Sequence, residues 1–349
     1  MTKKAKSTHV LVLRFSALGD VAMMVPVLLA VTRKYPELKI TISSRAFHKP
    51  LFDTIKNVSF YEADLKARHK GVLGLWKLAS ELKKLHINAV ADLHDVLRSN
   101  ILKLFFKLSA IQFIQINKGR AEKAVLIRTK NKNLHQLKTT HQRYADVFEK
   151  LGYPVTLNNT LILSKESLSK KVISFAGTKK EKWIGIAPFA AHKGKMYSLQ
   201  YMKKVIQELV KTNQYKIIMF GAGDKEERQL EQLVNDTKTI LNCAGKMTFS
   251  EELKLISNLD LMISMDSANA HLASNYGVPV ITLWGVTHPY AGFYPFGQPL
   301  SNALLSNRAD YPLIPTSIYG NKVPKGYDKV MNTISIEAVL TKIKEVLER

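Results

Sequence analysis

Apolar residues along the chain change repeatedly between short continuous runs and stretches in which they recur every three or four positions. A continuous run, as at 9–15, is typical of a buried parallel strand, whereas the helical spacing over 21–33 indicates an amphipathic helix. Through the first half, the same patterns predict strands at 38–43, 59–62 and 89–92 and helices at 75–84 and 97–108. This alternation predicts a parallel sheet wrapped by helices.

A polar, lysine-rich stretch at 164–182 is the expected linker, and the alternation restarts beyond it. Gly277 stands where a helix needs a left-handed cap before the next strand. The second half is predicted to contain strands at 183–187, 215–220, 259–264 and 278–284, helices at 199–211, 225–236 and 269–276, and a terminal helix at 334–349.

We therefore expect an α/β protein with two Rossmann-like, doubly wound parallel-sheet domains that face each other across a central cleft. The expected boundaries are 1–170 for the N-terminal domain and 180–330 for the C-terminal domain, followed by the helix at 334–349. Open parallel sheets bind ligands at the carboxyl ends of their strands. Chemistry-bearing residues are therefore sought in the segments that follow each strand.

Composition narrows the setting of this fold. The 349 residues include 52 Lys and Arg against 28 Asp and Glu, a net charge of +24 that should attract polyanions. Cys243 is the only cysteine, so no disulfide can form within the chain and a cytoplasmic setting is expected. No apolar run approaches the roughly 20 residues that span a bilayer. Charge alone also suggests nucleic-acid binding, but zinc-finger spacing and an RNP-like aromatic strand are absent from the sequence, so no nucleic-acid partner is expected.

The first informative turn, Ser16-Ala17-Leu18-Gly19-Asp20, lies between the first strand and the first helix. Gly19 allows a close approach of the backbone to a ligand, and the G-x-G-x-x-G dinucleotide pattern is absent. Asp20 has two interpretations. It can cap the helix, as aspartate often does, or it can serve as the general base that an inverting glycosyl transfer needs on the acceptor side.

The second informative turn carries Asp266 and Ser267 at the end of a strand, directly before a helix. The N–H groups and positive dipole end of that helix form an anion site suited to a diphosphate. His271 lies one turn further on, as a phosphate or acceptor contact or as a packed helical histidine.

Two more loops follow strands of the same half. The segment 188–195 supplies His192, Lys193 and Lys195, which can neutralise phosphate or simply lie on a solvated loop. The segment 221–227 has glycines that admit a ligand and acids that can hold ribose hydroxyls or favour the first turn of a helix. Together, three strand ends with nucleotide-like chemistry favour a nucleotide site.

The chain resembles the lipopolysaccharide heptosyltransferases of glycosyltransferase family 9 over nearly its whole length. The motifs that carry the resemblance are RFSALGD (14–20), DSANAHLA (266–273), GVP (277–279) and LWGVTHP (283–289). The resemblance implies the GT-B fold, inversion at the anomeric carbon, ADP-heptose as the donor and an inner-core Kdo-lipid acceptor. It assigns the acceptor to the N-terminal domain and the nucleotide sugar to the C-terminal domain.

The resemblance also implies roles for individual residues. Asp20 is similar to the family's catalytic aspartate, and the expected acceptor contacts are Ser16, Gly19, Arg98 and Arg120, with Arg98 inside a segment, 92–99, that is similar to an acceptor-side segment. The expected donor contacts are Lys195, a ribose-binding glutamate (Glu227, with Glu226 as the alternative), Met247 beside the adenine, and Asp266, Ser267, Ala268 and His271 around the diphosphate and sugar.

Three departures leave the donor sugar open. Ala268 stands where the donor loop often has glycine, and Ala190 and Ala191 stand where hydroxyl residues help to hold phosphate. A transferase or epimerase of the same fold that uses a UDP-sugar is therefore an alternative, and a basic polyanion-binding protein without catalysis is another.

No Asp-x-Asp motif occurs, so we expect a metal-independent enzyme without a cofactor. The expected partners are an ADP-sugar, an anionic glycolipid and the inner leaflet of the membrane. The basic residues expected to bind lipid phosphates are Arg98, Lys103, Lys107, Arg120 and Lys123.

Overall fold

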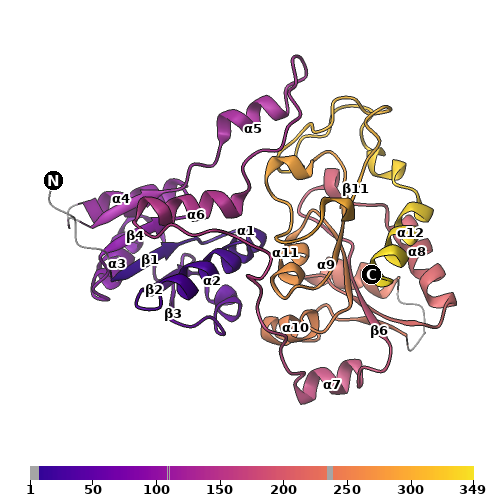
Figure 1. Cartoon of the computed structure of the whole chain (residues 1–349), viewed down its shortest axis with the longest axis horizontal. Coiled ribbons are helices and arrows are strands. Elements are labelled where there is room, and N and C mark those ends of the chain that lie inside the picture. The colour runs from indigo at the N-terminus through magenta and orange to yellow at the C-terminus, as the bar shows by residue number, and fades with distance from the viewer. Residues whose placement is uncertain (1–7, 108, 110, 234–238) are drawn as a thin grey trace. The chain divides into compact units, whose positions relative to one another are not determined.

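The computed structural model describes residues 8–107, 109, 111–233 and 239–349. Within this part, the chain divides into two compact units (Figure 1). Unit 1 contains the residues up to Lys118 together with Thr140–Ile162, and unit 2 contains Gly119–Thr139 and Leu163–Arg349. This division differs from the expected boundaries, since the segment Gly119–Thr139 groups with unit 2 and the terminal helix is part of that unit.

Unit 1 is built on a five-stranded sheet in the order β3-β2-β1-β4-β5, and every neighbouring pair is parallel. Its strands are β1 (His9–Leu13), β2 (Lys39–Ser44), β3 (Val58–Glu62), β4 (Ala89–Asp92) and β5 (Gln112–Gln115). Because the chain moves outward from β1 to β3 and then returns to β4, the strand order reverses beside β1. This reversal is the place where doubly wound sheets bind ligands.

Helices cover this sheet. The α-helices are α1 (Leu18–Ala22), α2 (Met24–Lys34), α3 (Gly71–Lys83), α4 (Leu97–Lys107) and α6 (Thr140–Lys150), and a 3-10 helix, η1, spans Ala46–Leu51. Helix α2 packs against α6, and α3 packs against α4. The α3–α4 pair shares one hydrophobic core with the sheet, made by Leu75, Leu78, Leu82, Leu102 and Phe106 from the helices and Leu11, Leu13 and Val90 from the strands.

Unit 2 is built on a six-stranded parallel sheet in the order β11-β10-β9-β6-β7-β8. Its strands are β6 (Lys182–Ala187), β7 (Tyr215–Met219), β8 (Ile240–Asn242), β9 (Leu261–Met265), β10 (Val280–Trp284) and β11 (Ala303–Leu305). Its α-helices are α5 (Arg120–Leu126), α7 (Lys170–Ala176), α8 (Leu199–Lys211), α9 (Asp224–Glu231), α10 (Phe249–Ile256), α11 (Ala268–Asn275) and α12 (Ile336–Leu347). Short 3-10 helices are η2 (Lys193–Lys195), η3 (Pro289–Ala291), η4 (Leu300–Asn302) and η5 (Val330–Thr333).

The expected fold class, two parallel-sheet Rossmann-like domains, is confirmed. Gly277 has a φ of +71°, as the cap at the end of α11 requires. The ends of the helices expected at 97–108 and 225–236 lie outside the described residues. Among the described helices, none has both the length and the apolar character of a membrane span.

Some elements were not predicted. The stretch expected to be a linker contains α7, whose first turn is capped by the Ser169 hydroxyl accepting from the Val172 N–H at 3.3 Å. Val172 and Ala176 are buried, so this short helix packs against the rest of unit 2 although the sequence around it is rich in lysine. Strands β5, β8 and β11 are only three or four residues long and lack a clear apolar run.

Candidate functional site

The carboxyl edge of the unit 1 sheet carries a buried arginine, Arg14, directly after β1. Its Nη2 lies 2.5 Å from Oδ2 of Asp20, and its Nη1 donates to the carbonyl of Leu93 at 2.5 Å. Asp20 is the third residue of α1, so it is not the N-cap, but its carboxylate accepts the N–H of the N-cap residue Ala17 and so makes one capping contact. The same turn returns the Asp20 carboxylate to the end of β1.

Tyr144, from α6, contacts both residues of this ion pair. The Tyr144 hydroxyl donates to the Asp20 carbonyl at 3.1 Å, and the Arg14 guanidinium lies over the Tyr144 ring, 6.0 Å from its centre. Tyr144 is fully buried, and burial raises the pKa of its hydroxyl well above the ordinary value, so this group remains a hydrogen-bond donor.

The two oxygens of Asp20 have different environments. Oδ2 accepts from Arg14 and, at 3.4 Å, from the Ala17 N–H. Oδ1 receives no hydrogen bond from any residue in the described part of the chain, and the side chain is 28% exposed. The carboxylate is therefore anchored by one oxygen, while the other is open to a ligand.

His94, after β4, borders the same turn. The Phe15 N–H donates to its Nδ1 at 3.4 Å, and its Nε2 lies 3.5 Å from the Ser16 hydroxyl. Burial, and the nearby charges of Arg14 and Lys118, lower the pKa of His94 to about 3. The ring is therefore neutral at physiological pH, and with Nδ1 accepting, Nε2 carries the proton and donates toward Ser16.

The predicted acceptor residues do not all belong to one unit. Ser16 and Gly19 lie in the turn before or within α1, and Arg98 is exposed at the start of α4, so these three share unit 1. Arg120 begins α5 and belongs to unit 2. Asp92, in the predicted acceptor segment, is fully buried and accepts the backbone N–H groups of His94 and Asp95, which gives it a structural role in that loop.

In unit 2, the predicted donor residues all follow strands on one sheet edge. Lys195 comes after β6, Glu226 and Glu227 after β7, Met247 after β8, and Asp266–His271 after β9. Because parallel strands share one carboxyl edge, four segments that are distant in sequence reach the same side of the sheet.

The centre of this edge is an ion pair between Lys195 and Asp266. Lys195 Nζ lies 2.8 Å from Asp266 Oδ2 and donates to the Asp266 carbonyl at 3.2 Å. The Thr287 hydroxyl, after β10, donates to the same Oδ2 at 3.0 Å. Asp266 thus holds the Lys195 ammonium group at the start of α11, and its contact with the donor stays a prediction.

The N-terminus of α11 has no side-chain cap. Ser267 is the N-cap residue, but its hydroxyl lies 2.9 Å from the Ser264 hydroxyl and caps nothing. Ala268 begins the helix, and His271 is buried one turn later. An uncapped helix start beside a lysine ammonium can bind an anion through both the dipole and the charge.

Glycines allow the loops behind Lys195 to pack closely. A Cβ atom at Gly320, where φ is +84°, would lie 2.5 Å from Cγ of Lys195. A Cβ atom at Gly285 would lie 2.3 Å from the carbonyl of Gly194. Larger residues at these positions would displace the lysine loop, so the backbone itself orients Lys195.

The two glutamates after β7 differ. Glu226 Oε2 accepts the Ala222 N–H at 2.8 Å, so Glu226 closes its own loop. Glu227 Oε1 lies 3.1 Å from Lys246 Nζ, and its carboxylate packs against Gly245, where a Cβ atom would come within 2.7 Å. Met247 follows this glycine and is half-buried. Of the two, Glu227 is better placed to meet a ligand over the ends of β7 and β8.

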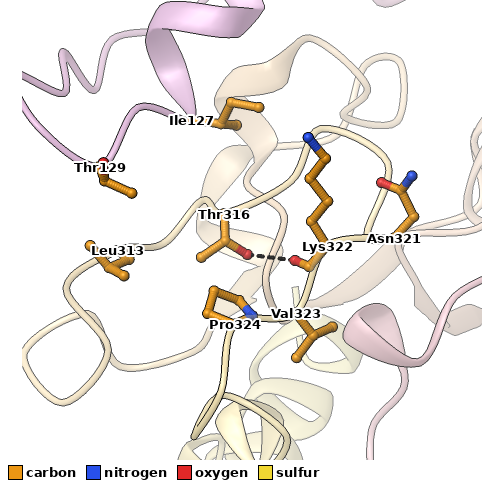
Figure 2. A pocket seen from close by; sticks show the side chains of 8 residues that line it. All are labelled: Ile127, Thr129, Leu313, Thr316, Asn321, Lys322, Val323 and Pro324. Atoms are coloured by element: carbon orange, nitrogen blue, oxygen red, sulfur yellow. Dashed lines mark hydrogen bonds between the residues drawn. The ribbon is translucent and has the colours of Figure 1, made fainter.

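A pocket of about 400 Å³ lies elsewhere in unit 2 (Figure 2). Its lining mixes apolar and polar side chains from two segments: Ile127, Thr129, Leu313, Thr316, Asn321, Lys322, Val323 and Pro324. The Thr316 hydroxyl donates to the Lys322 carbonyl at 2.8 Å, which closes the loop between them. None of the predicted site residues lines this pocket.

Sequence reasoning missed four residues of these two edges: Arg14, His94, Tyr144 and Thr287. Arg14 and Thr287 lie inside the motifs RFSALGD and LWGVTHP, so a signal was present without a role. His94 lies inside the segment 92–99, which is similar to an acceptor-side segment, so it too had a signal without a role. Tyr144 carries no local signal, since only the packing of α6 brings it to Arg14 and Asp20.

Comparisons with known proteins give relatives of this chain in both sequence and fold. The chain is 24% identical to a lipopolysaccharide core heptosyltransferase of Haemophilus influenzae, over 96% of each chain. Its fold is similar to the solved structure of a family 9 glycosyl transferase from Veillonella parvula (TM-score 0.76, 19% identity, 98% of this chain and 97% of that one). It is also similar to that of Escherichia coli heptosyltransferase WaaC with ADP (TM-score 0.68, 16% identity, 97% and 99%).

The family assignment comes from the sequence itself. The model of glycosyltransferase family 9 (heptosyltransferase) matches residues 75–316, which is more than half of the chain. This match confirms the resemblance that the motifs indicated, and with it the expectation of an enzyme. The chain belongs to glycosyltransferase family 9, the heptosyltransferase family.

Proposed function

We propose that this glycosyltransferase moves a heptose from ADP-heptose to the inner core of a lipopolysaccharide-type glycolipid, with inversion at the anomeric carbon. The observation that carries the proposal is the Lys195–Asp266 pair at the uncapped start of α11. A full-length relative named as a lipopolysaccharide core heptosyltransferase supports the choice of sugar and acceptor.

The donor's diphosphate would bind over the start of α11, where the Lys195 ammonium and the helix N–H groups meet its charge. Glu227 would accept hydrogen bonds from the ribose hydroxyls, and Met247 would pack against the adenine. Ser267, Ala268 and His271 would contact the diphosphate or the sugar. Lys195 and the helix start stabilise charge that grows on ADP as it leaves, so the departure needs no metal ion.

The acceptor hydroxyl would be deprotonated by Asp20. Oδ1 is the reacting atom, because Arg14 occupies Oδ2. As the bond between the anomeric carbon and the phosphate oxygen breaks, its electron pair leaves with ADP. The acceptor oxygen forms the new bond from the opposite side, and its proton passes to Asp20 Oδ1.

Ser16, Gly19, Arg98 and Arg120 would bind the acceptor, with the two arginines directed to anionic groups of the glycolipid. The enzyme would act at the cytoplasmic surface of the inner membrane, where exposed Lys and Arg bind anionic lipid. These assignments are part of the same proposal.

A titration of the full chain with ADP-heptose, ADP-glucose and UDP-glucose tests the donor. We expect ADP-heptose to give the largest rise in melting temperature and to be the only efficient donor, because a ligand stabilises the state that it binds. Lys195→Ala should lose most of this thermal shift, while Lys211→Ala, in the last turn of α8 where Lys211 pairs with Glu208, should keep it. Preferential stabilisation and turnover of UDP-glucose would instead support the UDP-sugar alternative that Ala190, Ala191 and Ala268 leave open.

A further inference from the structure

Helix α3 turns large apolar side chains toward solvent at its start. Leu73 is 82% exposed and Trp76 is 58% exposed, and Val72 is exposed beside them. The opposite side of the same helix is buried against the sheet through Leu75 and Leu78. Isolated exposed apolar residues are common, but an exposed cluster of Val, Leu and Trp on one helical face usually marks an interaction surface.

Helix α4 adds to this surface. Leu97 and Leu104 are exposed and lie seven residues apart, which places them on one side of the helix. Because α3 and α4 pack together over one face of the sheet, the sides that they turn away from it look in the same direction (Figure 1). We call Val72, Leu73, Trp76, Leu97 and Leu104 the α3–α4 apolar surface.

This surface lies at the reactive end of unit 1. Helices that follow parallel strands begin at the carboxyl edge of the sheet, and both α3 and α4 do so. The Arg14–Asp20 pair lies at that same edge, after β1. The starts of α3 and α4, which carry Leu73 and Leu97, therefore lie at the same edge of the sheet as Asp20.

Basic residues surround the apolar ones. Residues 64–107 contain nine Lys and Arg and four Asp and Glu. Of the four acids, Asp92 is fully buried, and Glu81 is bound to Arg68 and His69. The exposed cations include Lys70, Lys77, Arg98, Lys103 and Lys107. A helix face with Trp and Leu beside Lys and Arg is typical of segments that lie in the interface of an anionic bilayer.

We propose that the α3–α4 apolar surface inserts into the interfacial region of an anionic lipid bilayer and holds the Asp20 edge against the membrane. The proposal rests on the proposed function in one respect, since the glycolipid acceptor resides in that bilayer. The tryptophan and leucines supply the apolar contact, and the surrounding lysines and arginines supply attraction to lipid phosphates. A second copy of this chain fits less well, because two such cationic faces repel each other.

The chain provides its own reporter for this contact. It has three tryptophans, and Trp183 and Trp284 are fully buried, so Trp76 alone is in contact with solvent. Mixing the full chain with vesicles of phosphatidylcholine and phosphatidylglycerol should shift its emission to shorter wavelength, and brominated lipid should quench it. Vesicles of phosphatidylcholine alone should give a much smaller change, and added salt should weaken the response. An unchanged emission with anionic vesicles would overturn the proposal.

Variants then test the apolar contact. The double variant Leu73→Ser/Trp76→Ser should partition into anionic vesicles at least about tenfold less than the unaltered chain, because two large side chains no longer leave water. Leu300→Ser, at an exposed leucine of η4 in unit 2, should leave partitioning unchanged. Trp76→Phe should keep partitioning close to normal and lose the emission shift. Circular dichroism confirms that each variant is folded.

Two readouts separate this proposal from the proposed function. With a deacylated, lipid-free acceptor and ADP-heptose, the double variant should turn over at the normal rate. If the unaltered chain binds vesicles through Trp76 but transfers no heptose, the proposed function would be overturned, and the proposal for the α3–α4 apolar surface would stand. If the unaltered chain transfers heptose and the double variant still binds vesicles fully, the proposal for the α3–α4 apolar surface would be overturned. Loss of a dimer in the double variant, seen by sedimentation, would assign the surface to a second copy and also overturn it.

Discussion

At the scale of single residues, the Arg14–Asp20 pair determines which carboxylate oxygen of Asp20 is open to a ligand. Arg14 is buried, and its guanidinium is bound to Oδ2 of Asp20 and to the Leu93 carbonyl. An arginine stays protonated in such a position and offers a rigid fork of donors. The carboxylate therefore cannot rotate freely, and its second oxygen remains open to a ligand.

Replacing Asp20 tests this role. Asp20→Asn keeps the shape of the side chain but removes the proton acceptor, so we expect kcat to fall by roughly 10²–10⁴, the range for loss of a general base. ADP affinity should stay nearly unchanged, because the residues assigned to the nucleotide all belong to unit 2. Steady-state kinetics and an ADP titration measure the two quantities.

Asp53→Asn is the matched control, since Asp53 is an exposed carboxylate of the same unit that pairs with Lys49. It should leave kcat and ADP affinity unchanged. Normal turnover by Asp20→Asn would remove Asp20 from the mechanism, and an equal loss in Asp53→Asn would point to a general effect of charge on unit 1.

At the scale of elements, the first turn of α10 shifts the pKa values of two neighbouring glutamates, Glu251 and Glu252, in opposite directions. Thr248 and Glu251 form a reciprocal cap, in which the Thr248 hydroxyl accepts the Glu251 N–H and Glu251 accepts the Thr248 N–H. The Thr248 N–H and then Lys171 lower the pKa of Glu251. Burial raises the pKa of the adjacent Glu252 to about 7.

Glu252 should make the stability of unit 2 depend on pH. Its pKa in the folded state, about 7, lies above its ordinary value of 4.5, so the folded state binds the proton more tightly. The contribution of protonated Glu252 to the free energy of unfolding is fully present below pH 4.5, its ordinary pKa. It is lost as the pH rises through about 7, the pKa of Glu252 in the folded state. Glu252→Gln should therefore raise the melting temperature at pH 8 and change it little at pH 5.

Thermal unfolding of both chains from pH 5 to pH 8.5 measures this difference at pH values on either side of about 7. Glu337→Gln, at an exposed glutamate in the first turn of α12, is the control and should show no such dependence. A stabilisation by Glu252→Gln that is the same at both ends of the range would exclude burial of this carboxyl as the cause.

At the scale of the whole molecule, the proposed mechanism assigns to positive charge on the protein the role that a divalent metal has in other glycosyltransferases. The net charge is +24, and the donor edge places Lys195 beside the start of α11. The described residues contain no cluster of three or more His, Cys, Asp or Glu with the spacing of a metal site. In the proposed mechanism, Lys195 and the start of α11 would stabilise the charge on the leaving diphosphate.

Chelation tests this expectation. Transfer from ADP-heptose by the full chain should proceed at the same rate with and without EDTA, and added Mg²⁺ or Mn²⁺ should not accelerate it. Lys195→Ala should slow transfer under both conditions, because it removes a charge that no metal replaces. A loss of activity in EDTA that Mn²⁺ restores would contradict the metal-independent mechanism.

The amino-acid sequence by itself determined the two parallel-sheet domains, because buried strands and amphipathic helices each have a characteristic spacing of apolar residues along the chain. It also placed Asp20, Lys195 and Asp266 after strands, since each follows an expected strand within eight residues. These features depend on which residues are neighbours in the sequence, and a single sequence gives this information directly.

Only the tertiary structure decided how distant segments meet. It paired Asp20 with Arg14, set Tyr144 beneath them, joined Thr287 to Asp266, and grouped Gly119–Thr139 with unit 2. It also separated Glu226, which closes its own loop, from Glu227. The physical reason is that such contacts depend on how whole helices and strands pack against one another. The energy of that packing is spread over many residues, and their positions in the sequence do not show which of them lie close together.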